Sequence, residues 1–174
     1  SILVTASGQA DDDDLFGGPL AATMEELKAQ TSALYFSWWL AEKGVISKDD
    51  ATQATVRDVA WGFGHVSRGM YAANGQPRNY SQLASIQLGS AFKAGALTWK
   101  KDEKAANGTD VGCFEIDLEK WKPTIDALAK RVLMAKGKGD KKDALAMKAT
   151  FVDATDAWAD LRATITERWL RAPK

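Results

Sequence analysis

Two adjacent carboxylates, Glu25 and Glu26, stand near the start of an apolar helical pattern in the segment TMEELKAQTSALY, residues 23–35. On a helix, Glu26 shares a face with Gln30, and this face borders the apolar stripe. A carboxylate there can bind a metal ion, and an amide one turn away can hold it in the required orientation. Spacing alone favours another role, because Thr23 and Glu26 have the spacing of a capping box. The residues therefore leave two interpretations of Glu26 open, as part of a helix cap or as a metal ligand.

The only histidine of the sequence, His65, lies among glycine and aromatic residues in the segment WGFGHVSRG. Its imidazole could act as an acid, a base or a ligand, although a structural hydrogen bond is the commoner role of a lone histidine. Arg68 could hold a peptide carboxylate or pair with a carboxylate at the surface. Three tryptophans fit a peptide cleft, and core packing at helical spacing explains them as well: Trp38, Trp39 and Trp61.

Cap and turn signals predict a mainly α fold, a helical domain of about six helices with one small β-hairpin. The expected helices cover residues 23–43, 47–69, 80–94, 117–137, 141–152 and 155–170, and the expected strands cover 98–101 and 113–116. Residues 5–20 have loop chemistry, because four consecutive aspartates at 11–14 repel one another and glycines and a proline follow at 17–19. The aspartates lack the spaced ligands and the glycine of an EF-hand calcium loop.

Composition excludes several classes of function. The 23 basic residues balance the 23 acidic ones, so nothing indicates binding to nucleic acid or to an anionic membrane. A single cysteine excludes an internal disulfide and a cysteine-rich zinc site. The longest apolar run, residues 33–41, is too short to cross a membrane. We therefore expect a soluble protein in the reducing environment of the cytoplasm.

The chain is long enough for one compact domain, which we place at residues 22–174. Residues 1–21 are expected to be a loop or linker that continues from an upstream segment. The first residue is serine, and the opening residues SILV are typical of a strand already in progress. We therefore expect a fragment or a processed chain.

The segment EELKA at residues 25–29, followed by a helix that ends in LAEKGVIS at 40–47, resembles the acidic motif of the dipeptidyl peptidase III family of zinc peptidases. The likeness is greatest to the divergent bacterial and Nudix-associated branch. It continues through RGM at 68–70, SQLASIQLGSAFKAGAL at 81–97 and FEIDLEKWKPTIDALAKRVLMAKGKGD at 114–140. Outside the acidic motif, the resemblance consists mainly of the order of helices and turns over residues 22–152.

The resemblance implies a peptidase that removes dipeptides from the N-termini of short peptides with one zinc ion. In the family, a His-Glu-x-x-(x)-Gly-His helix supplies two ligands and the catalytic glutamate. By this resemblance, Glu26 corresponds to the third zinc ligand, with Glu25 and Gln30 as its hydrogen-bonding neighbours. Tyr80 corresponds to the residue that polarises the substrate carbonyl. Two neutral imidazoles and one carboxylate leave an open position at which zinc lowers the pKa of water.

This sequence departs from the family pattern at three places. It lacks the histidine helix, so an upstream segment or a second chain must supply the two imidazoles. Gln30 replaces an acidic residue, and Tyr80 replaces a histidine, although a phenol can donate the same hydrogen bond. We expect either part of a zinc peptidase completed elsewhere, with His65 and Arg68 as contacts to the short peptide, or a non-catalytic helical interaction module that has lost the metal site.

Overall fold

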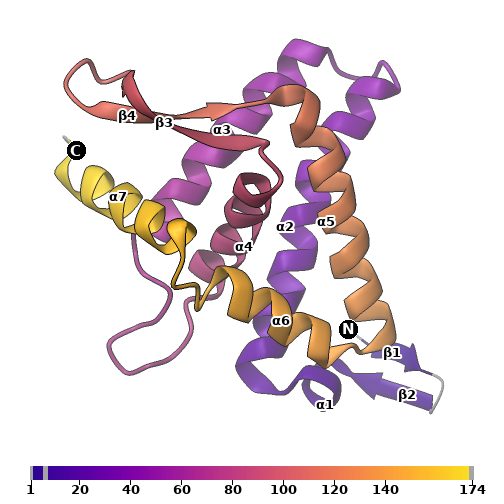
Figure 1. Ribbon diagram of the computed structural model, residues 1–174. Helices are drawn as coiled ribbons and strands as arrows, with labels where there is room; N and C mark the ends of the chain where they lie inside the picture. The colour runs from indigo at the N-terminus through magenta and orange to yellow at the C-terminus, as the bar shows by residue number, and fades with distance from the viewer. Residues whose placement is uncertain (1, 6–7, 173–174) are drawn as a thin grey trace.

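The computed structural model describes residues 2–5 and 8–172 of the chain. Within these residues it contains seven helices and two antiparallel hairpins, so the prediction of a mainly α fold is confirmed (Figure 1). No helix in the described part combines the length and the apolar character that crossing a membrane requires. In chain order the elements are β1 (Ile2–Thr5), β2 (Gly8–Asp11), α1 (Asp12–Phe16), α2 (Gly18–Glu42), α3 (Lys48–Val66), α4 (Asn79–Lys93), β3 (Leu97–Lys104), β4 (Val111–Ile116), α5 (Leu118–Lys138), α6 (Lys141–Phe151) and α7 (Ala157–Arg171).

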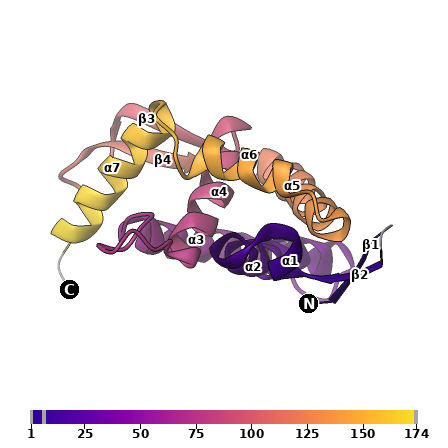
Figure 2. The same ribbon diagram turned by 90° about the horizontal axis from the view of Figure 1, so that it is seen from below.

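Helix α4 is the centre of the fold. In Figure 2, α1, α2 and α3 form one layer, α5, α6 and α7 form the other with the β3–β4 hairpin, and α4 lies between them. Every residue from 81 to 89 is buried, as expected for a helix covered on both sides. The Gln87 amide donates a hydrogen bond to the Thr31 hydroxyl across 3.0 Å, and the Ser85 hydroxyl donates to the Phe151 carbonyl oxygen across 2.6 Å. These bonds satisfy buried polar groups and fix α4 between α2 and α6.

The prediction of a loop over residues 5–20 is wrong. The segment contains β2, α1 and the first residues of α2. Asp11 caps α1, because its carboxylate accepts a hydrogen bond from the backbone amide of Asp14 across 2.8 Å. The aspartates that follow lie in the first turn, where the helix dipole favours negative charge. That residues 1–21 continue from an upstream segment stays a prediction.

Helix α2 begins earlier than predicted, at Gly18. Pro19 lies in the first turn, where its fixed φ suits a helix and its missing amide is not needed. Thr23 therefore lies inside the helix, with its hydroxyl 3.1 Å from the Pro19 carbonyl oxygen. The predicted capping box of Thr23 and Glu26 is wrong, so capping does not explain the carboxylate of Glu26.

The other helix boundaries follow the cap signals of the sequence. Ser47 caps α3 in a capping box with Asp50, and Asp117 caps α5. Helix α4 ends before Gly95, whose φ is 73°. Strands β3 and β4 are longer than predicted and pair antiparallel. Helix α7 docks on the same domain through the buried side chain of Trp158, whose indole nitrogen donates a hydrogen bond into α4 across 3.1 Å.

Candidate functional site

Glu26 lies on the side of α2 that faces the first turn of α4. The Thr23 hydroxyl, one turn earlier on α2, lies 2.9 Å from the side-chain oxygen of Asn79. This contact aligns Glu26 with Tyr80, the next residue of α4. The interaction of the Tyr80 hydroxyl with the nearby Glu26 carboxylate raises the pKa of Tyr80. The structure thus brings together the predicted metal ligand and the predicted catalytic tyrosine.

The surroundings of Glu26 suit a carboxylate that binds a cation. Its side chain is half-buried, and no lysine or arginine within residues 2–5 and 8–172 forms an ion pair with it. Partial removal of a carboxylate from water is unfavourable unless hydrogen bonds or a cation compensate for it. The Tyr80 hydroxyl lies close enough for its interaction with Glu26 to raise the pKa of the phenol, and the carboxylate retains lone pairs for a further partner.

Two aromatic side chains of α3 pack beside Tyr80. The ring centroids of Trp61 and His65 are 4.2 Å apart, those of His65 and Tyr80 are 5.4 Å apart, and the Trp61 ring meets Tyr80 edge-on at 6.2 Å. The Ser81 hydroxyl donates to the His65 carbonyl oxygen across 2.7 Å, which ties the start of α4 to the end of α3. Burial lowers the pKa of His65, and the charge of Arg68 lowers it further. The imidazole is therefore neutral at pH 7.

Glu25 faces another neighbour and belongs to an ion-pair network with α5. The buried ammonium of Lys136 donates to Glu25 across 2.6 Å and to Asp12 across 2.5 Å, and Lys28 donates to Glu25 across 2.6 Å. The hydrogen bond from Lys136, followed by that from Lys28, lowers the pKa of Glu25 to about 2. In this structure Glu25 joins α1, α2 and α5, and its predicted role beside a ligand at Glu26 stays a prediction.

Two further predicted residues lie on the same helices as the site. Gln30 follows Glu26 by one turn of α2 and is half-buried. This spacing keeps its amide on the side of the helix that carries Glu26. Arg68 follows the end of α3 and is exposed, and its charge reaches His65. The support of a ligand by Gln30 and the binding of a peptide carboxylate by Arg68 stay predictions.

The residues that the structure describes do not form a complete metal site. Among them, no group of three or more His, Cys, Asp or Glu side chains is arranged to hold a metal ion. Glu26 has the chemistry and the surroundings of one ligand, whereas the single imidazole of the sequence, that of His65, packs against Trp61 and Tyr80. A zinc site that includes Glu26 therefore needs ligands from outside the described residues.

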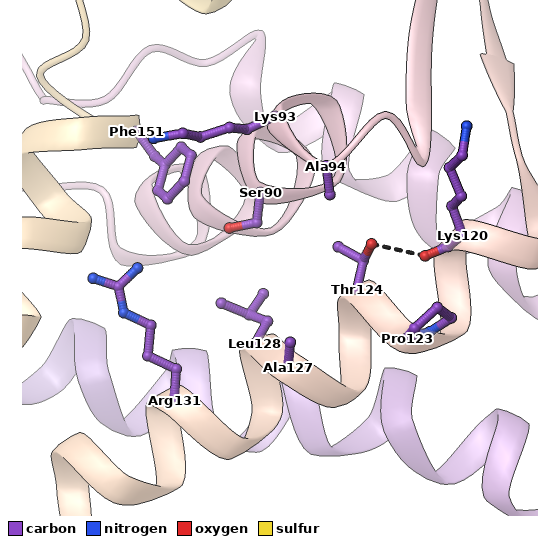
Figure 3. A pocket seen from close by; sticks show the side chains of 10 residues that line it. All are labelled: Ser90, Lys93, Ala94, Lys120, Pro123, Thr124, Ala127, Leu128, Arg131 and Phe151. Atoms are coloured by element: carbon purple, nitrogen blue, oxygen red, sulfur yellow. Dashed lines mark hydrogen bonds between the residues drawn. The ribbon is translucent and has the colours of Figure 1, made fainter.

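A hollow of about 520 Å³ lies between the C-terminal half of α4 and helix α5 (Figure 3). Ser90 of α4 lines it together with Leu128 and Arg131 of α5. None of the predicted site residues is among those that line it. Ser90 lies about 15 Å from Tyr80 along the axis of α4, at 1.5 Å per residue. The hollow is therefore separate from the pair formed by Glu26 and Tyr80.

Two features of this region have no counterpart among the sequence predictions. One is the burial of Lys136, which helical spacing could have revealed, because Lys136 continues the row of Leu128 and Val132 at intervals of four residues on the buried side of α5. The other is the packing of Trp61 against Tyr80. It joins two helices, so no pattern within one helix signals it.

The chain has detectable similarity to a known protein and to solved structures. No protein-family model matches it. It is similar to Nudix hydrolase 3 of Arabidopsis thaliana, with 26% identity over 120 residues, which make up 69% of this chain and 14% of that protein. It is also similar to the solved structure of dipeptidyl peptidase III from Caldithrix abyssi, with a TM-score of 0.76 and 18% identity over 99% of this chain and 29% of that one. For dipeptidyl peptidase III from Corallococcus sp. strain EGB the TM-score is 0.68, with 18% identity over 99% of this chain and 28% of that one.

These likenesses show the fold of the chain. Over nearly its whole length it has the fold of a segment of dipeptidyl peptidase III, so the resemblance predicted from residues 22–152 is confirmed at the level of the fold. The chain spans 29% and 28% of the two solved chains and 14% of Nudix hydrolase 3. The assignment of Glu26 as a zinc ligand stays a prediction.

Proposed function

We propose that this chain is one part of a zinc-dependent peptidase of the dipeptidyl peptidase III type, which cleaves short peptides with metal-activated water. The carboxylate of Glu26 carries the proposal, because it is half-buried, does not cap its helix and faces a hydroxyl donor. In this function Glu26 supplies one ligand, and an upstream segment or a second chain supplies two imidazoles. The fold shared with dipeptidyl peptidase III supports this placement.

Each residue of the site has a distinct task in this proposal. Zinc bound by two imidazoles and one carboxylate supplies an open position and lowers the pKa of a water molecule there. Glu26 provides the carboxylate on a rigid helix. The neutral imidazole of His65 can exchange hydrogen bonds with a peptide, and the guanidinium of exposed Arg68 can pair with the peptide's terminal carboxylate.

We assign Tyr80 the task of orienting the Glu26 carboxylate. A hydrogen bond to a metal ligand typically contributes about 10–100-fold to metal affinity. The substitution Tyr80→Phe removes the donor and keeps the ring that packs on Trp61 and His65. We therefore expect Tyr80→Phe to weaken zinc binding by about 10–100-fold, as measured by competition with a chromogenic chelator, and to leave the Tm of the zinc-free protein unchanged.

The matched control for Tyr80→Phe is Tyr71→Phe, which removes a hydroxyl that bonds Asp153 instead of Glu26. This control should keep the zinc affinity of the wild type. If Tyr80 polarises the substrate carbonyl, as the family resemblance implies, Tyr80→Phe will instead keep its zinc affinity and lose turnover. The two measurements together separate an orienting role from a catalytic one.

The experiment that tests the proposed function is the zinc content of the protein purified with all of its associated chains. We expect near-stoichiometric zinc in the wild type and none in Glu26→Gln. The stability of the zinc-free protein should be the same in Glu26→Gln as in the wild type, because Glu26 does not cap α2 and the amide oxygen of glutamine can accept a hydrogen bond from Tyr80 as a carboxylate can.

The matched control for Glu26→Gln is Glu42→Gln, near the other end of α2. Glu42 is exposed and pairs with Lys122 across 3.2 Å, so its loss should leave the zinc content unchanged. A wild-type protein without zinc, or a Glu26→Gln variant that retains it, would contradict the proposed function. The first of these results would favour a helical interaction module that has lost the metal site.

A further inference from the structure

The hollow between the C-terminal half of α4 and helix α5 combines an apolar lining with a basic rim. Leu128 and Ala127 of α5 line it, together with the ring of Phe151, the last residue of α6. Three basic side chains line it as well: Lys93, Lys120 and Arg131. Among the residues that the structure describes, no aspartate or glutamate lines the hollow. A concave apolar surface with charges of one sign suits an apolar ligand of the opposite charge.

Two of the three cations lie at the same end of the hollow, beside Phe151. The Lys93 side chain extends from α4 toward Phe151, and the guanidinium of Arg131 rises from α5 at this end, with the Ser90 hydroxyl pointing toward it (Figure 3). Lys120 lies at the opposite end, and its ammonium pairs with Asp117 across 3.1 Å. We call the group of Ser90, Lys93 and Arg131 the basic end of the hollow.

The polar groups of the basic end retain hydrogen-bond donors for a ligand. In the part of the chain that the structure describes, Lys93 forms no ion pair and the Ser90 hydroxyl makes no hydrogen bond. Arg131 donates to Asp143 through Nε and Nη2, across 3.0 Å and 2.7 Å, which leaves its Nη1 amino group available. Ser90 is half-buried and Lys93 is exposed, so a ligand from solvent can reach both.

The charges at the basic end favour an anion with a single charge. The pair with Arg131 lowers the pKa of Asp143, so Asp143 is ionised at pH 7 and offsets one of the two positive charges. One positive charge therefore remains for a ligand. A carboxylate neutralises this charge and can accept hydrogen bonds from a guanidinium, an ammonium and a hydroxyl. A phosphate monoester carries up to about two negative charges and would leave an excess.

The apolar part of the hollow is long enough for an extended chain. Its lining on α5 runs from Pro123 to Arg131, which is about 12 Å along the helix axis at about 1.5 Å per residue. The volume of about 520 Å³ lies within the range of small-molecule sites, about 300–1,000 Å³. A ligand anchored at the basic end can therefore extend over Leu128 toward Pro123.

We propose that this hollow is a binding site for a small aliphatic monocarboxylate. The carboxylate lies at the basic end, and the aliphatic chain covers Leu128 and Ala127. The inference goes beyond the proposed peptidase function and does not depend on it, because the hollow is separate from the pair formed by Glu26 and Tyr80. Loss of zinc binding in Glu26→Gln would leave this proposal unchanged.

Titration calorimetry of the chain with octanoate tests the proposal. We expect saturable binding of one octanoate per chain. Octanamide keeps the aliphatic body without the charge, and acetate keeps the charge without the body, so both should bind at least about 10-fold more weakly. No saturable binding of octanoate, or equal binding of octanamide, would overturn the proposal. Tighter binding of octyl phosphate than of octanoate would overturn the assignment to a monocarboxylate.

The substitution Lys93→Gln tests the basic end. It removes one exposed cation, so octanoate should bind about 5-fold more weakly. The matched control is Lys130→Gln, which removes another exposed lysine, one that does not line this hollow, and should bind octanoate as the wild type does. Equal weakening in both variants would mean that octanoate responds only to net charge, which would contradict the site.

The substitution Ala127→Leu tests the apolar lining. Ala127 is exposed, so leucine is tolerated in the helix, and its larger side chain fills the hollow. Octanoate binding should weaken by at least about 10-fold, while octanoate should bind to the control Ala146→Leu, on the exposed side of α6, as to the wild type. Unchanged octanoate binding in Ala127→Leu would place the ligand elsewhere and overturn the proposal.

Discussion

Replacing Lys136 with methionine is expected to destabilise the folded chain by about 3–5 kcal/mol. The ammonium of Lys136 is buried and donates hydrogen bonds to Asp12 and Glu25 across 2.5 Å and 2.6 Å, which joins α1 and α2 to α5. Methionine fills a similar volume but leaves the buried carboxylate of Asp12 without this cation. Removing one partner of a buried pair costs more than the pair contributes, because the remaining charge stays buried. Urea unfolding at pH 7 measures the loss.

The matched control is Lys138→Met on the same helix. Lys138 is exposed, so its substitution should change the free energy of unfolding by no more than about 0.5 kcal/mol. A loss in Lys136→Met no larger than that in Lys138→Met would mean that the network contributes nothing net to stability. The desolvation of three charges would then balance their attraction.

The pH dependence of unfolding gives a second check on the same variant. The hydrogen bond from Lys136 is the main cause that lowers the pKa of Glu25 from 4.5 to about 2. Because the pKa is lower in the folded state, the contribution of Glu25 to stability is complete above its unfolded pKa and is lost as the pH falls toward 2. In Lys136→Met this part of the pH dependence should become shallower, since the cation that lowers the pKa is gone.

The sequence predicted the helices whose starts are marked by capping side chains. The prediction was wrong where the same residues are compatible with two kinds of structure. Ser47 and Asp117 offer side-chain oxygens to helix amides, so the starts of α3 and α5 were correctly placed. A glycine pair followed by Pro19 is compatible with a loop and also with the first turn of a helix. Strand β2, Gly8–Asp11, has no alternating apolar pattern, so its pairing with β1 has no local signal.

From the sequence, the candidate site was predictable only within the short acidic motif at residues 25–29. Adjacent residues on a helix differ by about 100° in direction, so Glu25 and Glu26 must meet different neighbours. Which of them meets Lys136 and which meets Tyr80 depends on the docking of α5 and α4 on α2. The contact between Thr23 and Asn79, the first residue of α4, fixes how α4 docks on α2 near the site. This contact joins residues that are distant in sequence. Helical periodicity shows which side chains share one side of a helix, but it does not show which other element packs against that side.

The substitution Gly89→Val is expected to destabilise the chain by about 3 kcal/mol. Gly89 lies in the buried stretch of α4, at the point where α6 and α7 approach it. A Cβ atom there would lie 2.7 Å from the Phe151 ring and 2.8 Å from the indole nitrogen of Trp158. Both rings are buried, so neither can move aside without displacing its helix. Urea unfolding of the variant measures the effect.

Overpacking, rather than the loss of glycine itself, is the reason for this expectation, and Gly137→Val separates the two. Gly137 also lies within a helix, α5, but nothing lies within 4 Å of the Cβ that would be added there. The exchange of glycine for valine should change its stability by about 0.5 kcal/mol or less. Equal effects at both positions would mean that α6 and α7 adjust freely to α4. The close approach of α4 to α6 and α7 would then not require a glycine at position 89.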